Sequence, residues 1–215
     1  MPAFVPDLSV ILAFALAAFV LAITPGPDMA LQMSRAINHG FWHGMATGAG
    51  AMTGIAVHTT LVALGISVLI VAAPPLFLAL KIAGALYLVW LAWQALTRGG
   101  GIRITAAGKR APTLWQSYAT GLGINLLNPK VVLFFMTFLP QFVDAHDPAA
   151  TQKLFFLGVE FIFVSLPMMV LIVVFAQWIA DAFRKTKWVE RTINYSFAAI
   201  FAAFAATILT AQARH

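Results

Sequence analysis

The chain has 215 residues, of which 61% are hydrophobic and 9% are charged, with a formal net charge of +6 and a mean hydropathy of +0.90. Soluble domains carry about 25% charged residues, so this composition excludes a water-covered surface and indicates a polytopic membrane protein. The absence of cysteine excludes disulfides and thiolate metal sites. Basic loops between apolar runs explain the positive charge without nucleic-acid binding.

Six apolar runs follow one another along the sequence, and a membrane-spanning helix needs about 20 such residues. The runs cover residues 7–24, 41–71, 74–97, 116–143, 153–180 and 192–211. No basic segment precedes the first run, so we expect a retained span rather than a signal peptide. We therefore predict an all-α integral membrane protein with six transmembrane helices in a single domain, residues 1–215.

Two of the runs are interrupted by proline next to a charged residue. The first run ends at Pro25, Gly26, Pro27 and Asp28, and the fourth is broken at Asn128, Pro129 and Lys130. Proline suits the first position of a helix, and Gly or Asn suits the residue before it, so half-helices should begin at Pro27 and Pro129 and cover 27–38 and 129–142. Three spans separate the two breaks, which inverts the second copy. The pattern predicts a 3+3 inverted repeat of about 1–110 and 111–215.

The lysines and arginines gather on one side of the predicted spans. The loops after runs one, three and five hold Arg35, Arg98, Arg103, Lys109, Arg110, Arg184, Lys185, Lys187 and Arg191, whereas the opposite side holds Lys153 and Arg214. By the positive-inside rule the odd-numbered loops should lie in the cytoplasm. Both termini should then be extracytoplasmic.

Asp28 and Lys130 each follow the proline of a broken helix by one residue. Half-helix N-termini carry partial positive charge and bind anionic groups such as a carboxylate. Two inverted copies would bring both termini and both charges together near the middle of the membrane. The alternative is that the prolines only kink their helices and the charges lie at an interface.

The second run is rich in small residues at helical spacing, namely Gly40, Gly44, Gly48, Gly50 and Gly54. Small residues at this spacing allow helix backbones to approach closely. One interpretation is tight packing against a neighbouring helix. A compatible one is a smooth face along which the broken helices move.

Several ionisable residues lie within the apolar runs, where such groups are costly. His58 fits either a packing or a functional role, and Glu160 could pair with Lys81 or carry a coupled proton. His39 and His43 are four residues apart, but no third ligand stands at a recognisable spacing, so we expect no metal site. The sequence holds no motif typical of a hydrolase or a phosphate-binding loop.

Two segments resemble the signature regions of the lysine exporter translocator family, the LysE/RhtB type. They are "ITPGPDMALQMSRAINHGFWHGMATGAGAMTG" (23–54) and "GLGINLLNPKVVLFFMTFLPQFV" (121–143). The resemblance implies export of amino acids or close derivatives across a bacterial inner membrane, driven by an ion gradient, with the proton as the expected coupling ion. It places the chain nearer the homoserine, threonine and neutral amino-acid exporters. The family often has Asn at the position of Asp28, so a negative charge there is not a family requirement.

Together these features predict a carrier, expected to be a homodimer, that exports small zwitterionic amino acids by alternating access without a cofactor. The substrate carboxylate would be received by Lys130 and the half-helix N-termini at Pro27 and Pro129. Its amine would be contacted, or the unwound backbone held, by Asp28, Asn125 and Asn128. Gly48 and Gly54 would serve helix movement, and Glu160 and His58 are candidates for proton coupling. The alternative functions are a membrane-embedded enzyme using His58 and Glu160, and a membrane scaffold that transports nothing.

Overall fold

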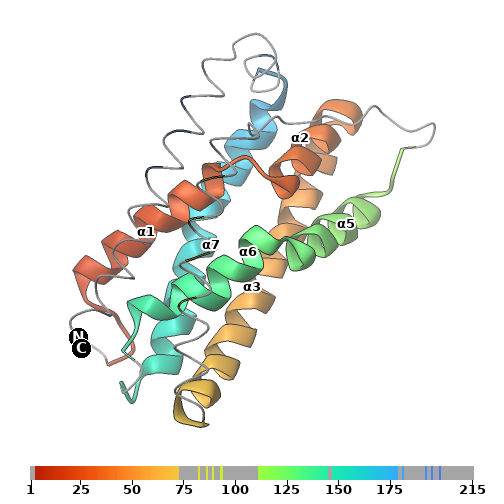
Figure 1. Cartoon of the computed structure of the whole chain (residues 1–215). Coiled ribbons are helices and arrows are strands. Elements are labelled where there is room, and N and C mark those ends of the chain that lie inside the picture. The colour runs from red at the N-terminus through yellow and green to blue at the C-terminus, as the bar shows by residue number, and fades with distance from the viewer. Residues whose placement is uncertain are drawn as a thin grey trace.

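The computed structural model describes residues 3–72, 111–144 and 147–178, together with single residues at 82, 86, 89, 93, 181, 192, 195 and 199. Within these residues the chain forms helices and turns, with no strand (Figure 1). The predicted third and sixth runs, 74–97 and 192–211, lie almost entirely outside the described residues, and so does Lys81. The observed architecture therefore concerns the two broken runs and the long helices beside them.

The first broken run forms α1 (Leu8–Ile23) and α2 (Pro27–His39), which are bent by 54° at the break. Helix α1 is apolar along its whole length and ends at Thr24, whose hydroxyl donates to the carbonyl of Val20 at 2.6 Å. Proline lacks the N–H that would continue the helical hydrogen bonds, but it is well suited to a first helical position. The half-helix predicted to begin at Pro27 is thus confirmed.

Helix α3 (Phe41–Ala72) follows α2 after a single-residue turn at Gly40, whose φ of +93° favours glycine. Helix α3 packs against α2, α5 and α7, and α1 packs against α7. Helix α7 (Ala150–Val174) runs antiparallel to α3 (Figure 1). In the first turn of α7, Lys153 donates to the carboxylate of Asp147, which precedes the helix, and this hydrogen bond lowers the pKa of Asp147. The two long helices form the frame beside which both broken runs lie.

The second broken run forms α5 (Leu114–Leu127) and α6 (Pro129–Leu133), again with a 54° bend between the two halves. The predicted half-helix 129–142 is helical to Phe142, but it continues from α6 as a π-helical turn, Phe134–Phe138, and a 3₁₀ turn, Leu139–Phe142. The reason is Pro140, which has no N–H to donate. The side chain of Gln141 instead donates to the carbonyl of Thr137 at 2.8 Å. The sequence pattern predicted the extent of this segment but not its irregular geometry.

Two described helices, Phe41–Gly65 and Ala150–Val174, are long and apolar enough to cross a membrane, and each bent pair can serve as one further span. The described residues therefore contain two to four candidate spans. The outer face of α1 supports this assignment, because large apolar side chains are exposed at intervals of three or four residues. They are Leu8, Leu12, Leu16, Phe19 and Ile23. A stripe of this kind is suited to lipid rather than water.

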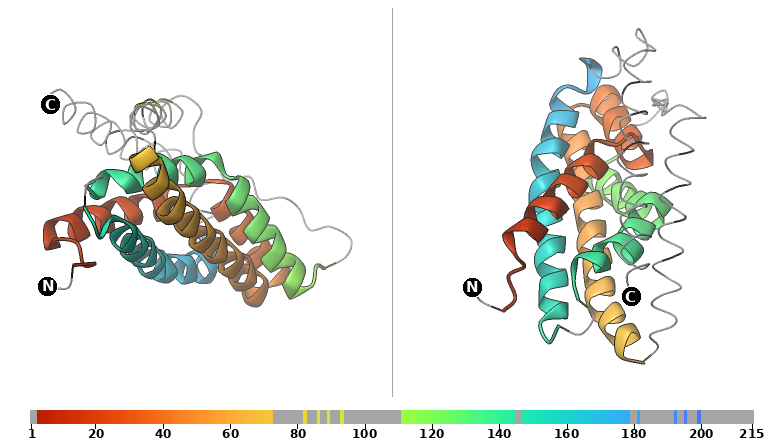
Figure 2. Two further views of the ribbon diagram at one scale, coloured as in Figure 1. Left: turned by 90° about the horizontal axis from the view of Figure 1, so that it is seen from below. Right: turned by 60° about the vertical axis from the view of Figure 1, so that its left-hand side comes forward.

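A cluster of aromatic side chains fills the space between α1, the segment after α6, and α7. Its members are Phe14, Phe134, Phe135, Phe138, Phe142 and Phe161. The rings of Phe14 and Phe142 meet edge to face at 5.2 Å, and so do those of Phe135 and Phe161. Figure 2 shows α1 and α7 lying side by side along this region. The cluster closes the core on the side of the molecule away from α2 and α5.

Candidate functional site

Lys130 connects the second helix break to the first. Its ammonium donates to the backbone carbonyl of Thr24 at 3.0 Å and lies 3.5 Å from that of Leu21. These carbonyls belong to the C-terminal end of α1, where the last groups of a helix have no intrahelical partner and carry partial negative charge. The lysine at the start of α6 therefore caps the end of α1.

Asp28 makes the corresponding connection in the opposite direction. Its Oδ2 accepts a hydrogen bond of 2.8 Å from the side-chain amide of Asn125, in the last turn of α5. Asp28 stands in the first turn of α2, where a negative charge is favoured by the helix dipole. Lys130, which follows Pro129, thus contacts the end of α1, and Asp28, which follows Pro27, contacts the end of α5.

Asp28 and Lys130 face the same region, yet both belong to the described residues and they form no ion pair with each other. Lys130 is satisfied by carbonyl oxygens, whereas Asp28 Oδ1 is buried without a hydrogen-bond partner among the described residues. A buried carboxylate oxygen without a partner is costly. The arrangement therefore leaves one carboxylate oxygen free for a ligand, whereas Lys130 would have to exchange its carbonyl partners for a ligand.

Neighbouring residues hold these two side chains in place. The side chain of Asn128 accepts from the backbone N–H of Lys130 at 3.0 Å, so it caps α6 as well as ending α5. A Cβ added at Gly26 would lie 3.1 Å from the Lys130 ammonium, and one added at Gly54 would collide with Asn125 Oδ1. These contacts explain why glycines lie beside the side chains of Lys130 and Asn125.

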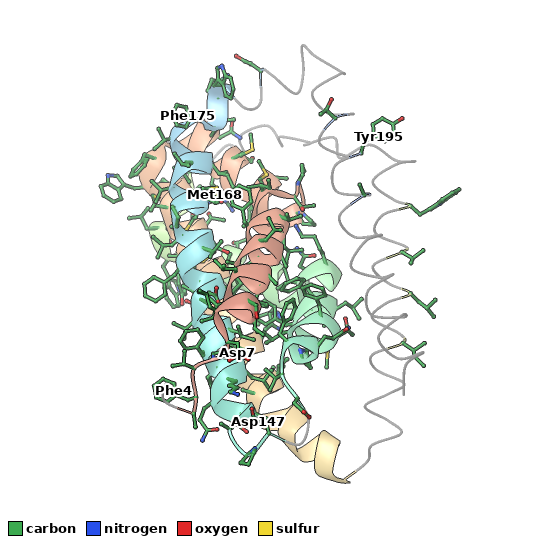
Figure 3. All side chains as sticks on the ribbon, turned by 90° about the vertical axis from the view of Figure 1, so that its left-hand side faces the viewer. Phe4, Asp7, Asp147, Met168, Phe175 and Tyr195 are labelled. Carbon is green, nitrogen blue, oxygen red and sulfur yellow. The ribbon has the colours of Figure 1, made fainter. Side chains whose placement is uncertain are left out.

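A cavity of about 80 Å³ lies between the two breaks. The polar and charged residues that line it are Thr24, Asp28, Gln32, Thr47, Asn125, Lys130 and Ser165. The remaining lining is apolar or glycine and comes from α1, α2, α3, α5, α6 and α7, with Met168 on the upper half of α7, far from Asp147 (Figure 3). Such a volume has room for a few waters or a small polar solute.

Gln32 and Gly48 bring three helices together at the wall of this cavity. Gln32 of α2 is buried, and its amide donates to the backbone carbonyl of Met169 in α7 at 3.3 Å. A Cβ added at Gly48 of α3 would collide with both Gln32 and Met169. The observed contacts support the packing interpretation of Gly48, while its service in helix movement stays a prediction.

The other predicted residues lie outside the cavity lining. His58 is buried, stacks on Phe135 and places its Nε2 3.4 Å from the backbone carbonyl of Asn125. Glu160 is half-buried in α7, and its Oε2 has no hydrogen-bond partner among the described residues. The rings of His39 and His43 are tilted by 59° with their centroids 5.7 Å apart, and the described residues contain no group of three metal-ligating side chains. His58 thus contacts the backbone at the end of α5, outside the cavity.

Four polar residues at the cavity were not predicted from the sequence: Thr24 with its carbonyl, Gln32, Thr47 and Ser165. Gln32 follows Asp28 by four residues on the same helix, so helical spacing could have placed it on the same face. A backbone carbonyl carries no sequence signal. Ser165 lies on a different helix from either break, and nothing in its local sequence distinguishes it.

The chain is similar to known proteins over nearly its whole length. The family described as "LysE type translocator" matches residues 19–212. The chain is 32% identical to the homoserine/homoserine lactone efflux protein of Salmonella typhimurium, covering 94% of this chain and 96% of the relative. It is 27% identical to the leucine efflux protein of Klebsiella pneumoniae, covering 94% and 95%. No solved structure matches. Because the family match covers nearly the whole chain, the protein belongs to the LysE type translocator family.

Proposed function

We propose that this protein is a secondary transporter that exports neutral amino acids or close derivatives. The observation that carries the proposal is the pair of opposite charges, Asp28 and Lys130, that line one cavity without a direct ion-pair contact. An amino acid is a zwitterion, so its carboxylate matches Lys130 and its ammonium matches the free Oδ1 of Asp28. The efflux activities named for the relatives, on homoserine and on leucine, fit a ligand of this class.

Lys130 links substrate binding to the shape of the first broken helix. A substrate carboxylate would compete with the Thr24 and Leu21 carbonyls for the Lys130 ammonium. A hydrogen bond from an ammonium to a carboxylate is stronger than one to a neutral carbonyl. The substrate carboxylate would therefore displace the carbonyls from Lys130 and leave the end of α1 uncapped. In this proposal the release of α1 begins the change from one access state to the other.

The wider architecture is part of the same proposal. The equal bends at the two breaks and the proline at the start of each second half-helix support a six-span, 3+3 inverted repeat. The distribution of lysine and arginine supports cytoplasmic odd-numbered loops and extracytoplasmic termini. We place the protein in a bacterial inner membrane as a homodimer, with export coupled to the proton gradient and Glu160 or His58 as the proton carrier.

The alternative of a membrane-embedded enzyme rests on His58 and Glu160. Neither side chain lines the cavity, and His58 is engaged with the backbone of the α5 break. No observation on the described residues favours catalysis by this pair. Transport therefore remains the function that the site supports best.

Counterflow in proteoliposomes tests the proposal. Vesicles that hold the purified protein and unlabelled homoserine should accumulate external radiolabelled homoserine transiently, and protein-free vesicles should not. In inverted membrane vesicles, a proton gradient should drive net uptake that an uncoupler abolishes. Failure of every neutral amino acid to exchange, with correctly inserted protein, would contradict the export function. If exchange persists but net uptake does not depend on the proton gradient, the export function stands and only the proton coupling is contradicted.

A further inference from the structure

One face of α7 forms the wall of the cavity and carries a single polar side chain. The cavity-lining residues of α7 are Phe161, Ser165, Met168, Met169 and Ile172. Their spacing of three or four residues puts them on one helix face. All of them except Ser165 are apolar, so this wall is suited to the side chain of a bound amino acid rather than to its charged groups.

Methionine gives this wall an adaptable surface. The chain has eight methionines, and those that line the cavity are Met29, Met52, Met168 and Met169. Methionine is flexible and offers no strong hydrogen-bond donor or acceptor. A wall of this kind accommodates side chains of different shapes without choosing among them by polarity.

Ser165 is the exception on this wall. Its side chain is 3% exposed, and its hydroxyl has no hydrogen-bond partner among the described residues. Hydroxyls on other helices of this protein donate to the carbonyl four residues earlier, as those of Thr24, Thr47 and Thr137 do. Ser165 lacks this usual bond, so its hydroxyl stays free on a cavity wall where an unpaired polar group is unfavourable.

We propose that Ser165 is a specificity-determining residue that hydrogen-bonds an oxygen on the substrate's side chain. The transporter would then prefer amino acids that carry a side-chain hydroxyl or carbonyl over aliphatic amino acids of the same size. The inference rests on the proposed function, because it concerns the side chain of an amino acid whose charged groups are bound by Asp28 and Lys130. A site built to pair with a hydroxyl discriminates strongly against an analogue that lacks it, since its own polar group is then left unpaired.

Homoserine and norvaline are suitable probes, because they differ by a terminal hydroxyl in place of a methyl group. Wild-type protein in proteoliposomes should exchange homoserine more efficiently than norvaline. Ser165→Ala should reduce the ratio of their kcat/KM values by about tenfold or more, mainly through slower homoserine exchange. Thr59→Val is the matched control. Thr59 is also buried with an unpartnered hydroxyl, but it packs against Gly158 and does not line the cavity, so its removal should leave the ratio unchanged.

Ser165→Cys provides a second measurement that does not depend on transport. The chain has no native cysteine, so a small thiol reagent would report on this position alone. Homoserine should slow the modification of Ser165→Cys and should not slow that of Thr59→Cys. An equal ratio of homoserine to norvaline exchange in wild type and Ser165→Ala, or an equal shift in Thr59→Val, would overturn the specificity role and leave export intact. Wild-type protein that exchanges neither probe nor any other amino acid would overturn the proposed function, and the inference with it.

Discussion

Lys130 and Asp28 have different partners, so their charges should not be equally important. The Lys130 ammonium is bound by carbonyl oxygens of α1, and Asp28 needs an oxygen that can accept from Asn125. Asparagine supplies such an oxygen, whereas no neutral side chain replaces the ammonium. At this scale the chemistry of the site is asymmetric even though the two breaks are arranged in the same way.

We expect Asp28→Asn to keep substantial homoserine export, within about threefold of wild type, because the amide oxygen of asparagine has two acceptor sites and can still accept from both Asn125 and the substrate ammonium. Lys130→Met should insert and purify normally but lose at least about tenfold in export, because it removes a charge-assisted bond to the substrate. Initial rates in proteoliposomes and elution on size exclusion check both. Equal loss in the two variants with recovery in the double variant would instead indicate an obligatory ion pair.

The same residues show what the sequence could and could not predict. Asp28, Asn125, Asn128 and Lys130 were predicted to share a site, and all of them except Asn128 line the cavity. This was possible because proline fixes where each half-helix begins, which is a local property of the chain. The partners of these residues depend on how distant helices pack. The capping of α1 by Lys130 and the position of Ser165 therefore became visible only in three dimensions.

Helix α3 approaches α5 so closely that a methyl group cannot fit at some positions. A Cβ added at Gly50 would collide with the backbone carbonyl of Tyr118, whereas one added at Gly65 of the same helix meets nothing within 4 Å. Backbone cannot move aside as a flexible side chain can. The separation of these two helices is thus set by glycine.

We predict that Gly50→Ala destabilises the protein by about 1–3 kcal/mol through overpacking. Gly65→Ala should have no such cost and should stabilise slightly, by about 0.5–1 kcal/mol, because alanine is the better helix former. Thermal unfolding of the two variants in detergent provides the comparison. A Gly50→Ala variant as stable as Gly65→Ala would show that α3 and α5 are further apart than described.

The distribution of lysine and arginine among the loops predicts the orientation of the whole molecule in the membrane. Gly101 and Thr186 belong to the basic loops and lie outside the described residues, whereas Pro148 is exposed just before α7. In intact cells an impermeant thiol reagent should label Pro148→Cys and leave Gly101→Cys and Thr186→Cys unlabelled. The parent chain has no cysteine to give background. Labelling at Gly101→Cys without labelling at Pro148→Cys would reverse the proposed topology.

The crossed hydrogen bonds between the two breaks have a consequence for biosynthesis. They join residues that are 97 and 106 positions apart in the chain. A ribosome delivers the end of α1 and Asp28 long before Asn125 and Lys130 exist. Asp28 and the carbonyls at the end of α1 are therefore made before the residues of the second half with which they form hydrogen bonds. These hydrogen bonds can form only after synthesis has passed Lys130, and a chain that ends before Asn125 leaves the first break without these partners.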